Sequence, residues 1–173
     1  MSESQFQNFN HLKIHSQYSI CEGAIKIDDL QDFSKSNKIK SLALCDTKNL
    51  CGALEVAEKI SKVGTQPIIG TQINFKFGDN IGLLPLFSLN EEGYKRIIKL
   101  SSVSFLENDE ISVPHVDFNN LLEDNSGVAI FSGTVFGLFG ELFNKGKFSE
   151  LQDLYKKLSS SFGDRFYIEI QRK

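Results

Sequence analysis

The sequence has few of the residues that mark the most easily recognised protein classes. Its 173 residues include no tryptophan, one methionine, three prolines, three histidines and three cysteines. The cysteines, Cys21, Cys45 and Cys51, are odd in number, and their spacing matches no zinc motif. This argues against a disulfide framework and a structural zinc site. We expect reduced thiols that act as small core residues of a cytoplasmic protein.

The sequence also contains no segment that resembles a membrane span or a targeting signal. No apolar run approaches the roughly 20 residues that cross a bilayer, and residues 1–5 are too short and polar for a targeting signal. The formal net charge of −3 argues against a protein that holds nucleic acid through its overall field. We therefore expect a cytoplasmic protein with no membrane partner.

Phenylalanine is abundant, with 15 residues, and 40% of the chain is hydrophobic, so one domain with an aromatic and aliphatic core is expected. Strand and helix patterns alternate along it. Strands are predicted over residues 11–16, 41–46, 66–77, 82–89, 128–132 and 166–171; helices over 27–37, 50–63, 91–105, 121–124, 136–143 and 149–162; and a loop over 108–114. This order predicts an α/β fold with a mostly parallel sheet or barrel.

Three details of this pattern carry further expectations. Pro85 lies inside a predicted strand, which favours an edge strand or a bulge. Phe136, Phe139 and Phe143 have the spacing of one helix face, which is more typical of a core face than of a binding surface. The last predicted strand ends close to Lys173 with no helix to cover it, so we expect an edge strand or a fragment of a longer polypeptide.

The first predicted strand and its following turn, from His11 to Ser19, have the form of a metal-binding motif with one ligand replaced. A His-x-His pair ending at His15 would need its first imidazole at residue 13, where the sequence has lysine. A protonated lysine cannot ligate a divalent cation, and its charge repels one. His11 is expected to be structural and His115 to lie on the surface.

A series of further segments resembles one known family. They are His11–Ser19 with Glu22–Lys26, Ala43–Asp46, Asn49–Glu55, Pro67–Gly70, Asn90–Tyr94, Leu100–Ser102, Ser132–Gly133 and Phe162–Gln171. Their order and spacing resemble the PHP (polymerase and histidinol phosphatase) domain at the N-terminus of the alpha subunit of bacterial DNA polymerase III. The resemblance implies a distorted (β/α)7 barrel. Residues 11–173 would form its N-terminal part, about two thirds, and residues 1–10 would lead into the first strand.

The resemblance also implies which positions hold metal ions in active members of the family. The seven positions fall on Lys13, His15, Glu22, Thr47, Gln72, Leu84 and Thr134, with Asp46 retained just before Thr47. Of these, His15 and Glu22 can still ligate in the usual way, and the family's final Asp-x-His motif would lie downstream. A cluster of two or three metal ions needs more anionic and imidazole donors than these. We therefore expect no catalytic residue, no bound metal and no cofactor in this segment.

Two alternatives for the remaining polar residues stay open. Asp46 and Glu22 could form a buried ion pair with Lys13 in place of the metals, and His15 could be a hydrogen-bonded residue at the end of its strand. Under an enzymatic alternative, His15, Glu22 and Asp46 would hold a residual divalent metal for a phosphoesterase or 3′–5′ exonuclease.

The leading expectation from the resemblance is a noncatalytic structural platform within a replicative DNA polymerase, itself a nucleotidyltransferase. The expected partners are the remainder of the polymerase alpha chain and the proofreading exonuclease (epsilon) subunit. DNA would be contacted only through the full polymerase.

Overall fold

The computed structural model describes residues 9–108 and 111–170, which form two compact units, residues 1–71 and 72–173. Strand β3, Gln66–Phe77, runs through the boundary between the units. Most of the expected N-terminal extension (residues 1–10), part of the predicted loop (109–110) and the end of the last predicted strand (171) lie outside the described residues.

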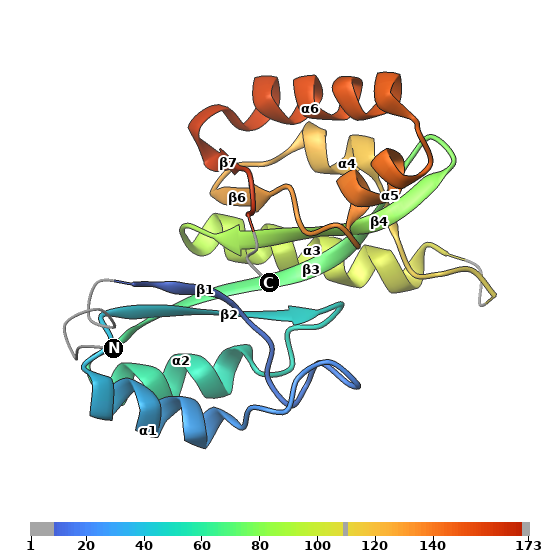
Figure 1. Cartoon of the computed structure of the whole chain (residues 1–173). Coiled ribbons are helices and arrows are strands. Elements are labelled where there is room, and N and C mark those ends of the chain that lie inside the picture. The colour runs from blue at the N-terminus through green and yellow to red at the C-terminus, as the bar shows by residue number, and fades with distance from the viewer. Residues whose placement is uncertain (1–8, 109–110, 171–173) are drawn as a thin grey trace. The chain divides into compact units, whose positions relative to one another are not determined.

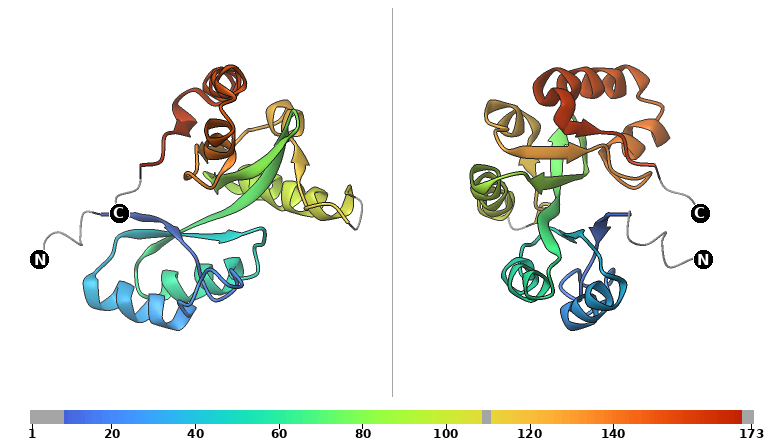
Figure 2. Two further views of the ribbon diagram at one scale, coloured as in Figure 1. Left: turned by 45° about the vertical axis from the view of Figure 1, so that its right-hand side comes forward. Right: turned by 90° about the vertical axis from the view of Figure 1, so that its left-hand side faces the viewer.

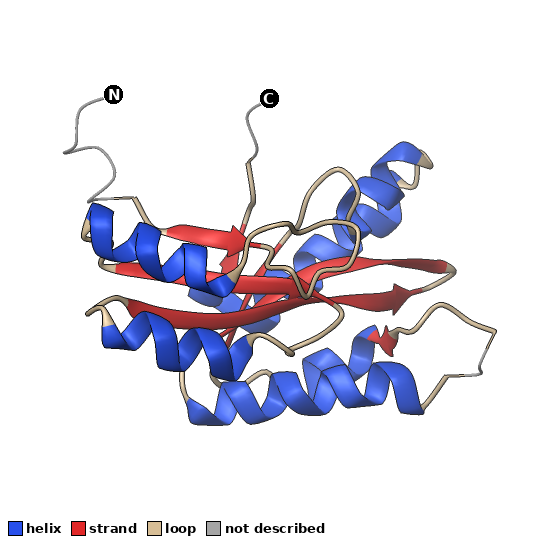
Figure 3. Cartoon of the chain, turned by 90° about the horizontal axis from the view of Figure 1, so that it is seen from below, coloured by secondary structure: helices blue, strands red, loops and turns tan. Residues whose placement is uncertain are grey.

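The first unit is built from β1 (His11–Ile14), α1 (Ile27–Asn37), β2 (Ser41–Thr47), α2 (Ala53–Lys62) and the start of β3. Strands β1 and β2 are parallel, with His11 opposite Leu42 and Ile14 opposite Leu44. Helices α1 and α2 lie side by side along the strands (Figures 1 and 3). Between them lies one apolar core, made of Ile27, Leu30, Ile39, Leu42, Leu44, Val56 and Ile60.

Helix α1 has the predicted bounds because its ends carry clear local signals. Asp28 and Asp29 lie in its first turn, where carboxylates interact favourably with the helix dipole. The helix ends at Lys38, whose left-handed backbone, with φ of 51°, lets its own N–H donate back to the carbonyl of Lys35 and the next N–H, of Ile39, donate to the carbonyl of Ser34. Helix α2 begins three residues later than predicted, because the N–H of Ala53 closes a turn on the carbonyl of Leu50.

The second unit contains the rest of β3, then β4 (Asn80–Ser88), α3 (Glu91–Leu106), β5 (Val116–Asp117), α4 (Phe118–Glu123), β6 (Val128–Phe131), α5 (Leu138–Asn144), α6 (Phe148–Phe162), a short 3-10 turn (Gly163–Arg165) and β7 (Phe166–Tyr167). Its strand order is β3-β4-β6-β7, with β5 beside β3. Helices α3 and α5 both pack against β4, and α6 packs on α5 (Figure 2).

The α/β class is confirmed, and the sheet is mixed, with both parallel and antiparallel pairs. Pairs β3–β5 and β6–β7 are parallel, whereas β4 and β6 are antiparallel. Strands β3 and β4 are neighbours joined by only two residues, which requires an antiparallel hairpin. Strand β5 was missed from the sequence because two residues are too few to show any alternation.

The prediction that Pro85 marks an edge strand is wrong, because β4 lies between β3 and β6, whereas a bulge at Pro85 stays a prediction. Pro85 is tolerated there because the ladder between β4 and β6 pairs only Leu86, Phe87 and Ser88. One residue beyond that ladder, the proline ring lies against Gly133 in the loop that follows β6.

The prediction that Phe136, Phe139 and Phe143 form the core face of a helix is also wrong. Leu138 and Leu142 are fully buried, whereas Phe136 precedes the helix and is 84% exposed and Phe143 is 61% exposed.

The cysteines likewise differ from the expectation, because Cys45 is buried in β2 whereas Cys21 and Cys51 are exposed.

Within the described ranges, no helix has both the length and the apolar character needed to cross a membrane.

A charged cluster connects the two helices of the first unit on their outer side. The ammonium of Lys59 in α2 hydrogen-bonds Asp28 in α1 and Glu55 one turn earlier in α2, the latter at 2.8 Å. The hydroxyl of Tyr18 donates to the other oxygen of Glu55 at 3.0 Å. The hydrogen bond from Lys59, with that from Tyr18, lowers the pKa of Glu55 below its ordinary value of 4.5.

We predict that the free energy of unfolding falls as the solution is acidified, in part because the Glu55 carboxylate becomes protonated. Because its folded-state pKa is lowered, its contribution is complete above about pH 4.5 and is lost as pH falls through the folded pKa. Urea denaturation of the chain at a series of pH values from 7 to 3 measures this slope. The Glu55→Gln variant should be less stable at pH 7 and should show a shallower acid slope, whereas Glu58→Gln, which changes an exposed neighbour, should retain the original slope. Equal slopes in all three proteins would contradict the prediction.

Candidate functional site

The candidate site in the first unit centres on Asp46, near the C-terminal end of β2. Its side chain is fully buried. The backbone N–H of Ser16 donates to Oδ1 at 2.6 Å, and the Ser16 hydroxyl donates to Oδ2 at 2.8 Å. A carboxylate in this position would cost several kcal/mol without such donors, so Ser16 offsets much of the burial cost.

Ser19 extends this network to both sides of Asp46. Its hydroxyl donates to Oδ1 of Asp46 at 2.7 Å and accepts the backbone N–H of Thr47 at 3.0 Å. The carbonyl of Asp46 accepts the hydroxyl of Thr71 at 2.7 Å. Asp46 therefore has its backbone and both carboxylate oxygens engaged in structural hydrogen bonds.

The turn that follows β1 is fastened to the end of β2 by further polar contacts. The Thr47 hydroxyl donates to the exposed Glu22 carboxylate at 2.5 Å, and the Asn49 amide donates to the carbonyls of Tyr18 and Thr47, each at 3.0 Å. Gly23 lies directly over Ser16, where an added Cβ would come within 2.0 Å of the Ser16 carbonyl oxygen. The turn can close this tightly only because residue 23 is glycine.

The structure thus brings three of the sequence-predicted positions, Glu22, Asp46 and Thr47, into one hydrogen-bonded cluster. Lys13 lies within β1 and His15 directly follows it, and both are partly buried. The Asp46 hydrogen bonds described above come from two serines. The proposed ion pair of Lys13 with Asp46 and Glu22 stays a prediction, as does the role of His15 at the strand end.

The remaining predicted positions lie in the second unit. Gln72 is a buried residue of β3, and Leu84 is fully buried among the core side chains of β4. Thr134 follows β6, and its hydroxyl accepts the backbone N–H of Phe136 at 3.1 Å, which closes a local turn. None of these three side chains is the anionic or imidazole donor that a divalent metal of this kind requires.

These residues do not fit a metal cluster. Within the described part of the chain, no three His, Cys, Asp or Glu side chains form a group that could hold a metal ion. The Asp46 carboxylate already accepts three hydrogen bonds at 2.6–2.8 Å, and a metal would have to displace the serine donors. In this structure the Asp46 carboxylate fastens the turn after β1 to the end of β2.

The fold and the spacing of these positions can be compared with known proteins. The sequence matches the PHP domain over residues 11–173. The chain belongs to the PHP domain family. The residues matched begin at the first residue of β1, so the PHP domain includes both the turn after β1 and the Asp46 cluster.

The PHP chain is also similar to DNA polymerase III alpha subunits. It is 35% identical to the subunit of Caulobacter vibrioides, covering 99% of this chain and 16% of that protein, and 36% identical to the subunit of Rickettsia felis, covering 95% and 14%. The chain therefore spans about a seventh of the length of these relatives.

Two solved structures show a distant likeness to this chain. A presumed metal-dependent phosphoesterase from Bifidobacterium adolescentis aligns with a TM-score of 0.44 and 14% identity, covering 95% of this chain and 58% of that one. An amidohydrolase from Chromobacterium violaceum aligns with a TM-score of 0.40 and 18% identity, covering 85% and 54%. Neither likeness is close enough to carry an argument about the chemistry of this PHP domain.

Sequence reasoning missed the two residues that hold Asp46. Ser16 and Ser19 stand three residues apart directly after the first strand, and a hydroxyl pair at that spacing is typical of a turn that hydrogen-bonds a neighbouring group. The spacing alone did not identify Asp46, thirty residues away from Ser16, as the acceptor.

We predict that Asp46 contributes strongly to stability. Removing its carboxylate in Asp46→Ala leaves the buried N–H of Ser16 and two hydroxyls without their acceptor, which should cost about 2–4 kcal/mol of unfolding free energy. Asp46→Asn should lose about half as much, because its carbonyl can still accept from Ser16 and a hydroxyl can turn to accept from the amide. Chemical denaturation measures both changes.

The matched control is Glu22→Ala, which removes an exposed acceptor of the same turn and should cost less than about 1 kcal/mol. Equal losses of unfolding free energy in Asp46→Ala and Glu22→Ala would show that the buried network adds no stability beyond that of an exposed hydrogen bond.

Proposed function

We propose that this chain is the PHP domain of a DNA polymerase III alpha subunit and serves there as a noncatalytic structural platform in DNA replication. The observation that carries the proposal is the engagement of Asp46. It is the acidic residue retained beside the expected ligand positions, and its carboxylate is taken up by Ser16 and Ser19.

The substitutions at the other positions support the same proposal. Lys13 places a cation, Gln72 an uncharged amide and Leu84 a hydrocarbon side chain where the family resemblance implies metal ligands. Each change removes negative charge or a coordinating atom from the place where active members would need it. Two other polar residues at these positions, Glu22 and Thr47, hydrogen-bond each other on the surface of the first unit.

We further propose a cytoplasmic location and two partners for this platform. The first is the remainder of the polymerase alpha chain, since the relatives are about six to seven times as long as this chain. The second is a separate proofreading exonuclease (epsilon) subunit, because a polymerase whose PHP domain lacks hydrolytic chemistry needs proofreading from another protein. DNA would then be contacted through the assembled polymerase.

We predict that the purified chain binds no stoichiometric metal. After incubation with manganese or zinc and gel filtration, elemental analysis should find well under one metal ion per chain. Hydrolysis of a phosphomonoester or a single-stranded 3′ end should not depend on added metal. Stoichiometric metal together with chelator-sensitive hydrolysis, lost in His15→Ala, would instead establish the residual phosphoesterase or exonuclease that uses His15, Glu22 and Asp46.

We predict that the chain retains the proofreading exonuclease subunit of its own organism in a pull-down. The matched control is the same experiment in the presence of excess untagged chain, which should compete the exonuclease away. An exonuclease that passes through without retention would contradict the docking role while leaving the noncatalytic assignment intact.

A further inference from the structure

A pocket of about 410 Å3 lies in the first unit, between β1, the segment that leads into α1, and α1 itself. Its volume is toward the lower end of the range for ligand-binding pockets, and it has room for more than one amino-acid side chain. The residues that line it are His11 and Ile14 of β1, Ile25 before α1, and Asp29, Leu30 and Phe33 of α1. The pocket therefore has a mostly apolar wall and one carboxylate.

The walls of the pocket are held in place by the fold. Leu30 is buried in the core of the first unit. The carbonyl of Ile25 accepts the backbone N–H of Gln17 at 2.9 Å. The ring of Phe33 meets the His11 ring edge-on, with 6.1 Å between the ring centroids. Because these contacts do not involve a ligand, the pocket is formed before any ligand binds, which lowers the entropy cost of binding.

Two apolar residues of the pocket remain partly open to solvent. The side chain of Ile25 is 44% exposed and that of Phe33 is 37% exposed. An apolar side chain of another molecule that covers them removes apolar surface from water, which favours association. A ligand that fits this wall therefore includes an apolar group.

Asp29 adds a charge at the edge of the apolar wall. Asp29 and Phe33 are four residues apart in α1, so the carboxylate and the ring are neighbours on one face of the helix. Asp29 is exposed and forms no ion pair with another described residue, whereas Asp28 is paired with Lys59. Among the described residues that line the pocket there is no lysine or arginine, so a phosphate would meet a negative charge and a cationic ligand is favoured.

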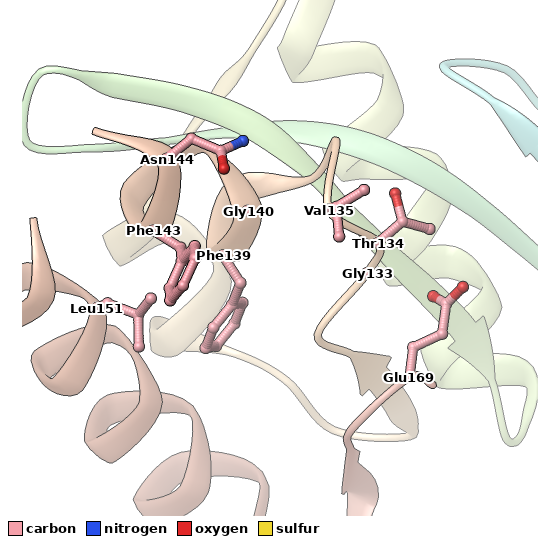
Figure 4. Close-up of a pocket in the computed structure, with 9 residues that line it drawn as sticks. All are labelled: Gly133, Thr134, Val135, Phe139, Gly140, Phe143, Asn144, Leu151 and Glu169. Carbon is pink, nitrogen blue, oxygen red and sulfur yellow. The ribbon is translucent and has the colours of Figure 1, made fainter. Parts of the chain in front are cut away.

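A second pocket, of about 320 Å3 beside α5 in the second unit, differs in this respect (Figure 4). It is lined by the rings of Phe139 and Phe143 and by Glu169. Glu169 already has an interaction of its own. Of these two apolar pockets, the one beside α1 is therefore the one whose carboxylate is uncommitted.

We propose that the pocket beside α1 is a docking site for a partner polypeptide that presents a leucine next to an arginine. The leucine side chain fills the apolar part of the pocket, between Ile14, Ile25 and Leu30. The arginine guanidinium is planar and weakly hydrated, so it lies on the Phe33 ring while it donates two parallel hydrogen bonds to Asp29. This assignment concerns the surface of the first unit alone, and it holds whether or not the partner is the exonuclease subunit.

The test is a titration of the isotopically labelled 173-residue chain with acetyl-Leu-Arg-amide, followed by the amide chemical shifts in NMR spectra. Saturable shifts are expected at Ile14, Ile25, Leu30 and Phe33, with a Kd on the order of 1 mM for so small a probe. Acetyl-Leu-citrulline-amide keeps the shape but lacks the charge, and acetyl-Ala-Arg-amide lacks the large apolar side chain. Each comparison peptide should bind at least about fivefold more weakly.

Three variants separate the parts of the proposal. Asp29→Asn should weaken binding of acetyl-Leu-Arg-amide about fivefold and leave binding of the citrulline peptide unchanged, because it removes only the charge. Phe33→Leu should weaken binding of the arginine peptide by a smaller factor through loss of the ring, and it tests the site even if Asp29→Asn fails to fold. The matched control is Asp32→Asn, which changes an exposed aspartate of the same helix outside the pocket and should alter the Kd by less than about twofold.

Equal binding of acetyl-Leu-Arg-amide and either comparison peptide would overturn the proposal. Shifts at the four pocket residues that do not saturate, or a Kd that is unchanged in both Asp29→Asn and Phe33→Leu, would overturn it as well.

Discussion

The hydrogen bonds between the buried carboxylate of Asp46 and the two serines of the turn after β1 are the interaction on which the first unit depends. They join β2 to a turn that starts thirty residues earlier in the sequence, and they satisfy a charge that could not otherwise remain inside the protein. The same bonds occupy both oxygens of the carboxylate. A carboxylate that accepts three short hydrogen bonds from its own chain is a poor ligand, since a metal would have to break the closure of the turn to bind it.

This arrangement supports the proposal of a noncatalytic PHP domain, because the chain's own side chains hold the ends of its strands together. In a metal site, cations would hold the ends of neighbouring strands together. Here Ser16 and Ser19 do so for Asp46, and the Thr47 hydroxyl does so for Glu22. The core beneath them packs Leu42 and Leu44 on α1 and α2. Under the proposed function, fold and hydrolytic chemistry are separable in this chain.

The sequence pattern correctly predicted the helices and strands that are marked by clear residue spacing and end signals over a few residues. The bounds of α1 and β3 follow from helical spacing with acidic residues in the first turn, and from a long alternation of apolar residues. The pattern failed where tertiary packing decides. In α5, leucines and phenylalanines each form a stripe at a spacing of four residues, and only the packing against β4 selects Leu138 and Leu142 for the core. Pro85 looked like an edge residue because the sequence cannot show that the ladder to β6 starts one residue later.

The candidate site was predicted in the same uneven way. Family resemblance placed Glu22, Asp46 and Thr47 at one site, and the structure joins them through Ser19 and the turn after β1. It could not identify Ser16 and Ser19 as the partners of Asp46, because a hydrogen bond between distant residues leaves no local pattern.

A double-mutant cycle between Asp46 and Ser19 tests the central claim most directly. The unfolding free energies of the chain and of the variants Asp46→Ala, Ser19→Ala and the double variant would be measured without added metal, with chelator present. If the carboxylate and the hydroxyl form a structural closure, the sum of the losses of unfolding free energy in the two single variants should exceed the loss in the double variant by about 1 kcal/mol or more. Additive losses would contradict the account. So would a separate measurement in which manganese or zinc stabilises the wild-type chain but not Asp46→Ala.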